Sequence, residues 1–232
     1  MIEGLSCSIN TQNQKKYHFR GDRDMKILNL YAGIGGNRKL WKDVDVTAVE
    51  LNPKIAAIYQ DFFPNDKVIV VDAHQYLLEH HSEYDFIWSS PPCPTHSQLG
   101  RLRVLSESKI TGAYLSKAKY PDMKLYEEIL LLKHYFKGKY CVENVIAYYK
   151  PLIAPIEIQR HHFWSNFLIR HITLEADNID KGKIQEWEEK TGFNLSQYSN
   201  IDKRLLLRNC VRPELGLHIL NESKINRYPE LF

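Results

Sequence analysis

The sequence predicts an α/β protein with a doubly wound, mostly parallel sheet, and three observations support this fold class. Short apolar runs alternate with amphipathic segments, as expected for strands joined by helices. A glycine-rich turn, residues 33–36, closes the first apolar run. Polar and acidic residues recur where later apolar runs end, and ligands of such sheets bind beyond the carboxyl ends of the strands.

Each element follows from its own pattern. The continuous apolar run KILNLYA suits a buried parallel strand, and three shorter runs after it suit further strands. Apolar residues on one face predict helices between and after them. In chain order we expect strand 26–32, strand 46–50, helix 54–63, strand 67–73, helix 74–81, strand 84–90, helix 123–136 and strand 139–144. Two strands meeting near 160–163 within 156–174, a charged segment at 175–207 and a helix at 211–224 complete the prediction.

Composition is that of an ordinary globular protein. The chain has 232 residues, of which 44% are hydrophobic and 25% charged, enough for one well-buried domain. No apolar run is as long as a membrane span and no signal peptide opens the chain, so we expect a cytoplasmic protein without a membrane partner. A net charge of +3 permits a polyanionic partner without requiring one.

The four cysteines, Cys7, Cys93, Cys141 and Cys210, lie far apart and form no CxxC pair. This spacing argues against a metal site and against a disulfide framework. Cys93 stands out because prolines flank it at a strand end, where they hold the backbone stiff and extended. A nucleophilic thiol needs such positioning together with partial exposure and a lowered pKa, although a lone cysteine is more often a buried apolar residue.

The strand ends also suggest a cofactor. The GIGG turn lets a ligand approach the backbone, and Glu50 ends the second strand, where acidic residues bind ribose hydroxyls in sheets of this kind. Asp72 ends the third strand. Because no GxxxxGK[ST] phosphate loop is present, this set favours S-adenosylmethionine over ATP. Glu143 follows on the fifth strand, where its carboxyl could act as an acid beside Cys93.

These residues resemble the motifs of the DNA cytosine-5 methyltransferases, in the order that this family keeps. LNLYAGIGG is similar to the first motif, SSPPCPTHS to the nucleophile motif, VENV to the sixth and RNCVRPELGLHIL to the last. The resemblance implies a Rossmann-like methyltransferase fold that binds S-adenosylmethionine and double-stranded DNA. It implies catalytic roles for Cys93, Glu143 and Arg160. It assigns the cofactor to Tyr31, Ala32, Gly33, Ile34, Gly35, Gly36, Glu50, Leu51, Asp72, Ala73, Pro91, Leu125, Asn209 and Val211, and nucleic acid to Ser97, Arg101, Arg103 and His162.

The sequence departs from the family in two places. The eighth motif usually reads Gln-x-Arg-x-Arg, whereas IQRHHFW contains one arginine; in one register Arg160 matches the first arginine and His162 the second. Only residues 168–207 fill the place of the family's large target-recognition domain. We therefore expect an N-terminal arm (1–24), a catalytic core (25–167), a reduced recognition insert (168–207) and a C-terminal helix returning to the core (208–232).

Target choice would then rest on the reduced insert, on the loop after Cys93, or on a homodimer or specificity partner. In the implied mechanism Cys93 adds to carbon 6 of a flipped cytosine, and Glu143, with a pKa raised by burial, assists at N3. Two alternatives stay open: a tRNA or RNA cytosine-5 methyltransferase, and a non-catalytic DNA-binding subunit. RNA enzymes usually carry their nucleophile in the sixth motif, where Cys141 lies, but Cys141 is expected in the core of its strand.

Overall fold

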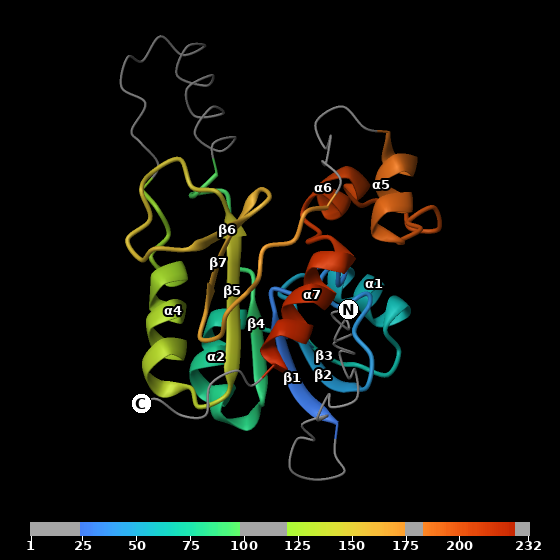
Figure 1. Ribbon diagram of the computed structural model, residues 1–232. Helices are drawn as coiled ribbons and strands as arrows, with labels where there is room; N and C mark the ends of the chain where they lie inside the picture. Colours follow the sequence, from blue (N-terminus) through green and yellow to red (C-terminus); the bar gives the residue numbers. More distant parts are fainter. Residues whose placement is uncertain (1–23, 98–119, 175–182, 226–232) are drawn as a thin grey trace, which may run out of the picture. The chain divides into compact units, whose positions relative to one another are not determined.

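The computed structural model describes residues 24–97, 120–174 and 183–225, and Figure 1 shows how its elements are arranged. Within these residues one seven-stranded sheet has the order β3-β2-β1-β4-β5-β7-β6. The first five strands of this order are parallel, and β7 lies antiparallel to both β5 and β6. This confirms the predicted α/β class with its mostly parallel sheet. The strands are β1 (Met25–Leu30), β2 (Val44–Val49), β3 (Lys67–Ile69), β4 (Phe86–Ser89), β5 (Lys139–Val145), β6 (Ile156–Ile158) and β7 (His161–Ser165).

Several strands, among them β1, β3 and β4, are shorter than the sequence predicts, and a local hydrogen bond accompanies the end of β3 and of β7. β3 ends at Ile69 because Asp72 is already the N-cap of the next helix, where its side chain accepts from the backbone N–H of Gln75 at 2.9 Å. β7 ends at Ser165, whose hydroxyl donates to the carbonyl oxygen of Phe167 at 2.7 Å. The chain therefore turns out of the sheet at both points.

Four helices confirm the sequence prediction, while α5 and α6 lie in the segment that was expected only to be charged. α5 contains only two apolar residues, Ile184 and Trp187, and the three leucines of α6 are consecutive in a helix of six residues, so neither segment shows the periodicity that reveals a helix. The helices are α1 (Pro53–Phe62), α2 (Ala73–His80), α4 (Lys124–Tyr135), α5 (Ile184–Thr191), α6 (Lys203–Arg208) and α7 (Pro213–Ser223), with a 3-10 turn at His81–Glu83.

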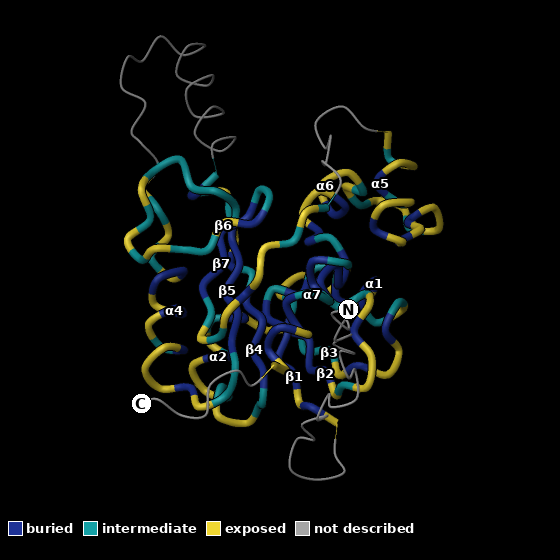
Figure 2. Tube along the Cα trace, in the orientation of Figure 1, coloured by how far each residue is buried: buried dark blue, intermediate teal, exposed yellow. Residues whose placement is uncertain are grey.

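Helices cover both faces of the sheet. Leu77 of α2 and Leu132 of α4 pack with Leu28 on one face, and all three are fully buried. Leu215 of α7 packs with Ile27 on the other face. Figure 2 shows the buried residues concentrated in the strands and on the inner sides of these helices. The sheet is thus doubly wound, which leaves the carboxyl ends of its parallel strands as the place for a ligand.

The segment 183–208 packs against α1. Trp187 of α5 and Leu206 of α6 share a buried cluster with Ile58 of α1. The hydroxyl of Tyr198 donates to a carboxylate oxygen of Asp61 at 2.9 Å. These contacts attach the reduced insert to the helix that follows β2.

The proposed division of the chain stays a prediction. Residues 1–23 of the expected arm, and with them Cys7, lie outside the described residues, as do residues 175–182 of the insert and 226–232 of the last segment. Ile169 and Leu174, at the start of the insert, pack with the core cluster under α7. Among the helices that the structure describes, none has the length and hydropathy that a membrane span requires.

Close backbone contact fixes α7 on the loop after β1. A Cβ atom at Gly216 would meet the carbonyl oxygen of Asn37 and lie 2.7 Å from its Cα, a separation that real side chains do not reach. Asn37 is itself held by its side-chain amide, which donates to Asn29 of β1 at 2.8 Å. Neither partner can move freely, so only glycine fits at position 216.

Gly216→Ala should therefore lower the free energy of unfolding by about 1–3 kcal/mol, the usual cost of overpacking a tight site. Urea unfolding followed by circular dichroism measures this as a lower midpoint. Asn221→Ala, an exposed position on the same helix, is the control and should not lower the midpoint, since alanine is the better helix former. Equal midpoints for Gly216→Ala and the parent chain would show that the contact is not tight.

Candidate active site

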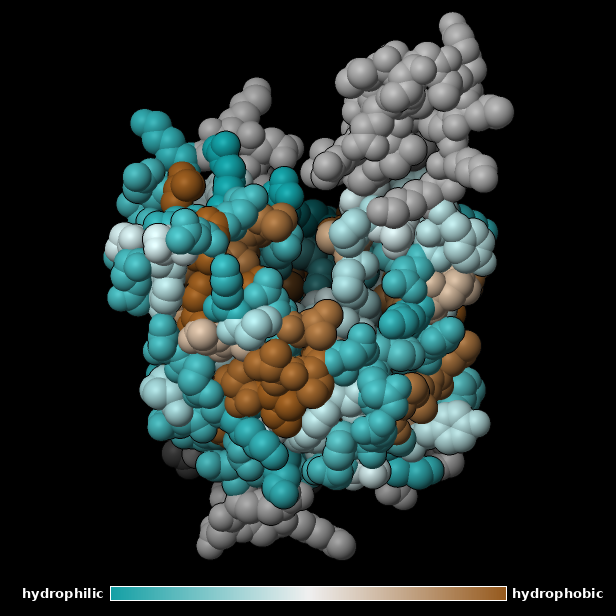
Figure 3. Space-filling view, turned by 180° about the vertical axis from the view of Figure 1, so that it is seen from behind, coloured by the Kyte–Doolittle hydropathy of each residue, from teal (hydrophilic) through white to brown (hydrophobic). Residues whose placement is uncertain are grey.

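The predicted site residues meet at one edge of the sheet. β2, β1, β4 and β5 are neighbours and parallel, so the segments that follow them lie side by side at their carboxyl ends. Figure 1 shows these ends at the upper edge of the sheet, and in Figure 3 the surface is hollowed there. The edge brings together the glycine turn, Glu50, Cys93 and Glu143.

The glycine turn has an unusual backbone. Tyr31, Gly33 and Gly35 have φ angles of +55°, +55° and +86°, in the left-handed region that favours glycine. A Cβ at Gly33 would have no heavy atom within 4 Å, so one side of the turn is open. A Cβ at Gly35 would instead collide with the rings of Phe63 and Tyr59 on α1. The turn is therefore anchored on one side and open to a ligand at Gly33.

Glu50 holds the turn in place. One carboxylate oxygen accepts from the N–H of Gly33 at 3.0 Å, and the other accepts from the N–H of Asn52 at 2.9 Å. A carboxylate offers about four acceptor positions, so two remain for the hydroxyls of a ribose. Leu51 beside it is 64% exposed, an apolar surface suited to an adenine ring. Asp72 is exposed but already caps α2, and Ala73 after it is buried.

The last motif lies against the glycine turn, as its resemblance implies. A Cβ at Gly36 would lie 2.6 Å from the carbonyl oxygen of Val211 and 2.7 Å from the Cβ of Cys210. Asn209, the C-cap of α6, is exposed directly before them. Ala32 and Ile34 of the turn are buried in the cluster with α1. Residues far apart in the sequence thus lie together around the glycine turn, and their small and polar groups fit a nucleoside cofactor.

A buried carboxyl group that the sequence did not single out contacts Tyr31 of the glycine turn. Glu128 of α4 accepts from the hydroxyl of Tyr31 at 2.6 Å and from the hydroxyl of Ser89 at 2.5 Å, and it contacts His74 at 3.1 Å. Burial and Glu128 raise the pKa of Tyr31, and a hydrogen bond to Glu128 raises that of His74. Leu125, one turn earlier in α4, is buried in the same core. Helical periodicity could not reveal Glu128, because polar residues on a predicted helix are normally solvated.

Cys93 is partly exposed in a tight turn after β4. Its carbonyl oxygen accepts from the N–H groups of His96 and Ser97 at 2.9 and 3.0 Å, and the side chain of Asn144 donates to the carbonyl oxygen of Pro91 at 2.9 Å. The lowered pKa that a nucleophilic thiol needs is absent from Cys93 in this structure. Burial and the carboxylate of Glu143 raise the pKa of Cys93, and the backbone, Arg208 and Arg160 only partly offset this.

The pKa of Glu143 differs from the sequence prediction, which was that burial raises it. Burial raises its pKa, but the charge of His161 and hydrogen bonds from His161 and Ser90, with Arg160, outweigh burial, so its pKa is lowered. The contact with His161 is short, 2.6 Å from Nδ1 to a carboxylate oxygen. The predicted rise in pKa failed because the sequence offered no sign that a histidine two strands later would reach this carboxylate.

Arg160 lies near Cys93, whereas His162 lies in the core. Arg160 lies in the turn between β6 and β7, donates to the carbonyl oxygen of Arg208 at 3.2 Å and acts electrostatically on Cys93. His162 is 2% exposed, packs against Trp164 and contacts Glu157 at 3.1 Å. Because side chains alternate along a strand, its ring points away from Glu143. This placement does not fit the predicted contact with nucleic acid; His161 is the histidine at the site.

The remaining predictions separate into three groups. Cys141 is fully buried on β5, which confirms its expected place in the core, and burial raises its pKa well above the usual value. Ser97 forms a strand-like bridge with Ala147. Arg101 and Arg103 lie outside the described residues. In the part of the chain that the structure describes, no three His, Cys, Asp or Glu side chains are arranged to hold a metal ion.

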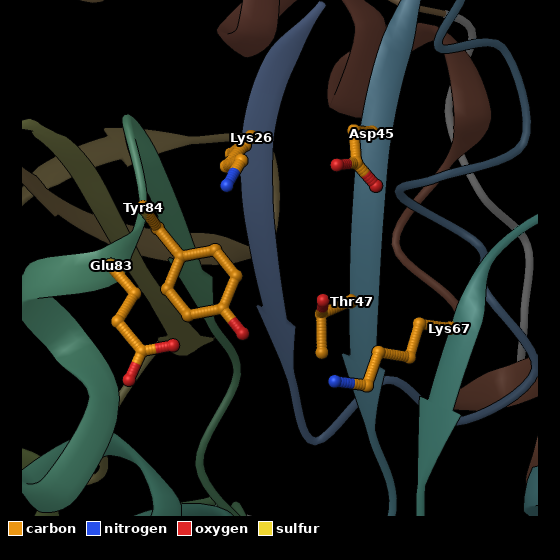
Figure 4. Close-up of a pocket in the computed structure, with 6 residues that line it drawn as sticks. All are labelled: Lys26, Asp45, Thr47, Lys67, Glu83 and Tyr84. Carbon is orange, nitrogen blue, oxygen red and sulfur yellow. The ribbon is translucent and has the colours of Figure 1, made fainter.

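A pocket at the opposite end of the strands is unrelated to these residues. It lies where β1, β2 and β3 begin, and Figure 4 shows lysine, acidic, hydroxyl and phenol groups around it. The amino ends of parallel strands face away from the glycine turn and Cys93. Its lining residues are Lys26, Asp45, Thr47, Lys67, Glu83 and Tyr84.

Part of the chain is similar to proteins of a known family. The family model of C-5 cytosine-specific DNA methylases matches residues 25–112. Human tRNA (cytosine(38)-C(5))-methyltransferase is 26% identical over 98 residues, which cover 39% of this chain and 25% of that protein. The DNA-directed RNA polymerase subunit beta'' of Bigelowiella natans is 30% identical over 87 residues, 35% of this chain and 6% of that protein. This chain thus matches only a small part of either relative's length.

Among solved structures, a mutant of Spodoptera frugiperda DNMT2 shares 26% identity, with a TM-score of 0.34 over 52% of this chain and 35% of that chain. The segment matched by the family model contains the glycine turn, Glu50, Asp72 and Cys93. S-adenosylmethionine is the methyl donor of this family, and the open glycine turn beside Glu50 fits it. Residues 25–112 of this chain are therefore similar to the C-5 cytosine-specific DNA methylases.

Proposed function

We propose that this protein transfers a methyl group from S-adenosylmethionine to carbon 5 of a flipped cytosine in double-stranded DNA, through a covalent adduct with Cys93. The observation that carries the proposal is the meeting of Cys93, Glu143 and Arg160. Both charged groups act electrostatically on the thiol, and all three lie at the edge that holds the glycine turn. Nucleophile, acid and cation are the groups that this reaction needs.

The chemistry follows from the weakness of carbon 5 as a nucleophile. Addition of the Cys93 thiolate to carbon 6 turns the ring into an enamine, whose carbon 5 can attack a methyl cation donor. Glu143 provides a proton or hydrogen bond at N3, which withdraws charge as the thiolate adds. Arg160 holds the carbonyl oxygen of the base. Transfer of the carbon 5 proton to water and expulsion of Cys93 then restore the aromatic ring.

Electrostatics couple the two central groups. The Glu143 carboxylate raises the pKa of Cys93, so the ionised carboxylate disfavours the thiolate. Protonation of Glu143 removes this repulsion, while Arg160 and Arg208 continue to favour the thiolate. The nucleophile is thereby activated when the base is in place.

The methyl donor would be held by the residues around the open glycine turn. Glu50 offers its free acceptor positions to the ribose, and Leu51 offers an apolar surface to the adenine. The backbone at Gly33 approaches the amino-acid part of the cofactor. When bound, S-adenosylmethionine supplies the electrophilic methyl group.

In a duplex DNA partner the ring face that Cys93 attacks is inaccessible, so the target base would have to be flipped out of the stack. The basic residues after Cys93, Arg101 and Arg103, would contact phosphates. The reduced insert, residues 168–207, would read the target, alone or together with a homodimeric or other specificity partner.

A second candidate is a tRNA cytosine-5 methyltransferase. The match to the human tRNA (cytosine(38)-C(5))-methyltransferase favours it. The fully buried Cys141 argues against an RNA-type mechanism with its nucleophile in the sixth motif, and leaves Cys93 as the nucleophile for either nucleic acid. A non-catalytic subunit is the third candidate, and the partly exposed Cys93 beside Glu143 argues against it.

Glu50→Ala should weaken S-adenosylmethionine binding about 10- to 100-fold, because hydrogen bonds to a charged group contribute about 1.5–3 kcal/mol. Isothermal titration calorimetry measures the affinity, and circular dichroism checks the fold. Asp45→Ala removes an exposed carboxylate from the other end of the same strand and should bind as the parent does. Unchanged affinity in Glu50→Ala would exclude Glu50 from the cofactor site.

Cys93 can be tested by trapping its adduct. Fluorine at carbon 5 of the target cytosine blocks the final elimination, so DNA with 5-fluorocytosine should form a complex that requires S-adenosylmethionine and survives denaturing electrophoresis. Cys93→Ser should abolish it, while Cys141→Ala should retain it. The same assay on 5-fluorocytosine tRNA separates the substrates: an adduct with tRNA alone would contradict the DNA proposal, and one mapped to Cys141 would overturn the nucleophile.

The size of the insert predicts a short or degenerate target. A segment of this length presents few base-reading side chains, so we expect a recognition site of no more than about six base pairs. Sequencing the methylome of a methylation-free host that expresses the chain measures this directly. A longer site would contradict the expectation unless the protein proves dimeric or bound to a partner by size-exclusion chromatography.

A further inference from the structure

A buried histidine contacts the acid of the proposed site from the neighbouring strand. His161 is 5% exposed and begins β7, which pairs antiparallel with β5. In this register His161 lies opposite Val145, and its ring reaches diagonally to Glu143, with Nδ1 2.6 Å from Oε1. The proposed mechanism as described so far gives this histidine no part.

The proposed reaction requires a proton between the carboxyl group of Glu143 and N3 of the base, and this requirement bears on the contact with His161. An ionised carboxylate only accepts hydrogen bonds, and N3 of neutral cytosine is also an acceptor. The lowered pKa of Glu143 makes it a carboxylate in the free protein. Carboxylate and N3 would then repel each other unless a proton lies between them, so productive binding needs Glu143 protonated on the oxygen that faces the base.

We propose that His161 is a positioning residue for Glu143 in the methyl-transfer site. Its Nδ1–H donates to Oε1 and leaves the other carboxyl oxygen to carry the proton toward N3. As the bond between Sγ and carbon 6 forms, that O–H bond breaks and an N3–H bond forms, and the carboxylate that remains is stabilised by the same Nδ1–H. On elimination the proton returns to Glu143. This inference rests on the proposed function.

The surroundings of the pair support this role. The other titratable or charged groups that interact with Glu143 are Cys141 on its own strand, Cys93 after β4 and Arg160 in the β6–β7 turn. Ser90 also donates to Glu143, and its oxygen in turn accepts from the indole N–H of Trp88 at 2.8 Å. The carboxyl is thus held on several sides.

His162 offers a matched control. It is the next residue, is equally buried and also contacts a glutamate, Glu157, but its ring lies on the opposite face of the sheet against Trp164. Substituting each histidine by asparagine removes one titratable ring and leaves an amide that can still donate a hydrogen bond.

The test measures methyl transfer by the full chain across pH, on whichever of duplex DNA and tRNA the parent methylates. His161→Ala should lower kcat about 10- to 100-fold with little change in KM, since general acid catalysis contributes about 100- to 10,000-fold and Glu143 itself remains. His161→Asn should recover part of this loss. Both variants lose the charge that lowers the pKa of Glu143, so Glu143 stays protonated to higher pH and the alkaline limb of activity should move upward. His162→Asn should keep the parental profile.

A parental rate and pH profile in His161→Ala would overturn the inference. If the parent methylates neither DNA nor tRNA, the proposed function fails, and nuclear magnetic resonance then decides the pair on its own. In the ¹⁵N-labelled chain, Glu143→Gln should shift the ring-nitrogen signals of His161 and leave those of His162 in place. Unshifted His161 signals would overturn the contact itself.

Discussion

The carboxyl group of Glu128 is the interaction on which the candidate site depends. A buried carboxyl is costly unless it is hydrogen-bonded, and this one gathers Tyr31, Ser89 and His74 around it. Tyr31 opens the glycine turn in a left-handed backbone conformation, and Ser89 ends β4 just before the prolines of the Cys93 loop. One group in α4 therefore sets the starting points of both the cofactor turn and the nucleophile loop.

The direction of the strands is the second feature on which the candidate site depends. β5 is the last parallel strand, and the hairpin of β6 and β7 returns beside it in the antiparallel sense. This reversal carries Arg160 to the carboxyl end of β5 and lets His161 reach Glu143. Strand alternation then separates two adjacent histidines onto opposite faces, so that one belongs to the site and the other to the structural core.

In the free protein, ionisation of Glu143 opposes ionisation of Cys93. His161, Ser90 and Arg160 lower the pKa of Glu143, and burial together with the charge of Glu143 raises the pKa of the Cys93 thiol. A thiolate at Cys93 and the carboxylate of Glu143 would repel each other. In the proposed reaction, ionisation of the thiol is linked to the protonation of Glu143, which a bound base would control.

Much of this protein could be predicted from its sequence, because strand periodicity, glycine turns and proline-flanked loops are local properties. The alternation of apolar runs determined the parallel sheet and four of its helices, and the motif order determined that Gly33, Glu50, Cys93 and Glu143 would meet at one edge. The short helices α5 and α6 could not be predicted because neither shows apolar residues at helical spacing: α5 has two, and those of α6 are consecutive in a helix of six residues. The pKa shift of Glu143 was predicted with the wrong sign, since it depends on neighbours that only folding supplies. Tertiary structure alone decided that Glu128 would be buried beneath the turn and that His161, not His162, would contact Glu143, because strand pairing and register are set by the packing of the whole sheet.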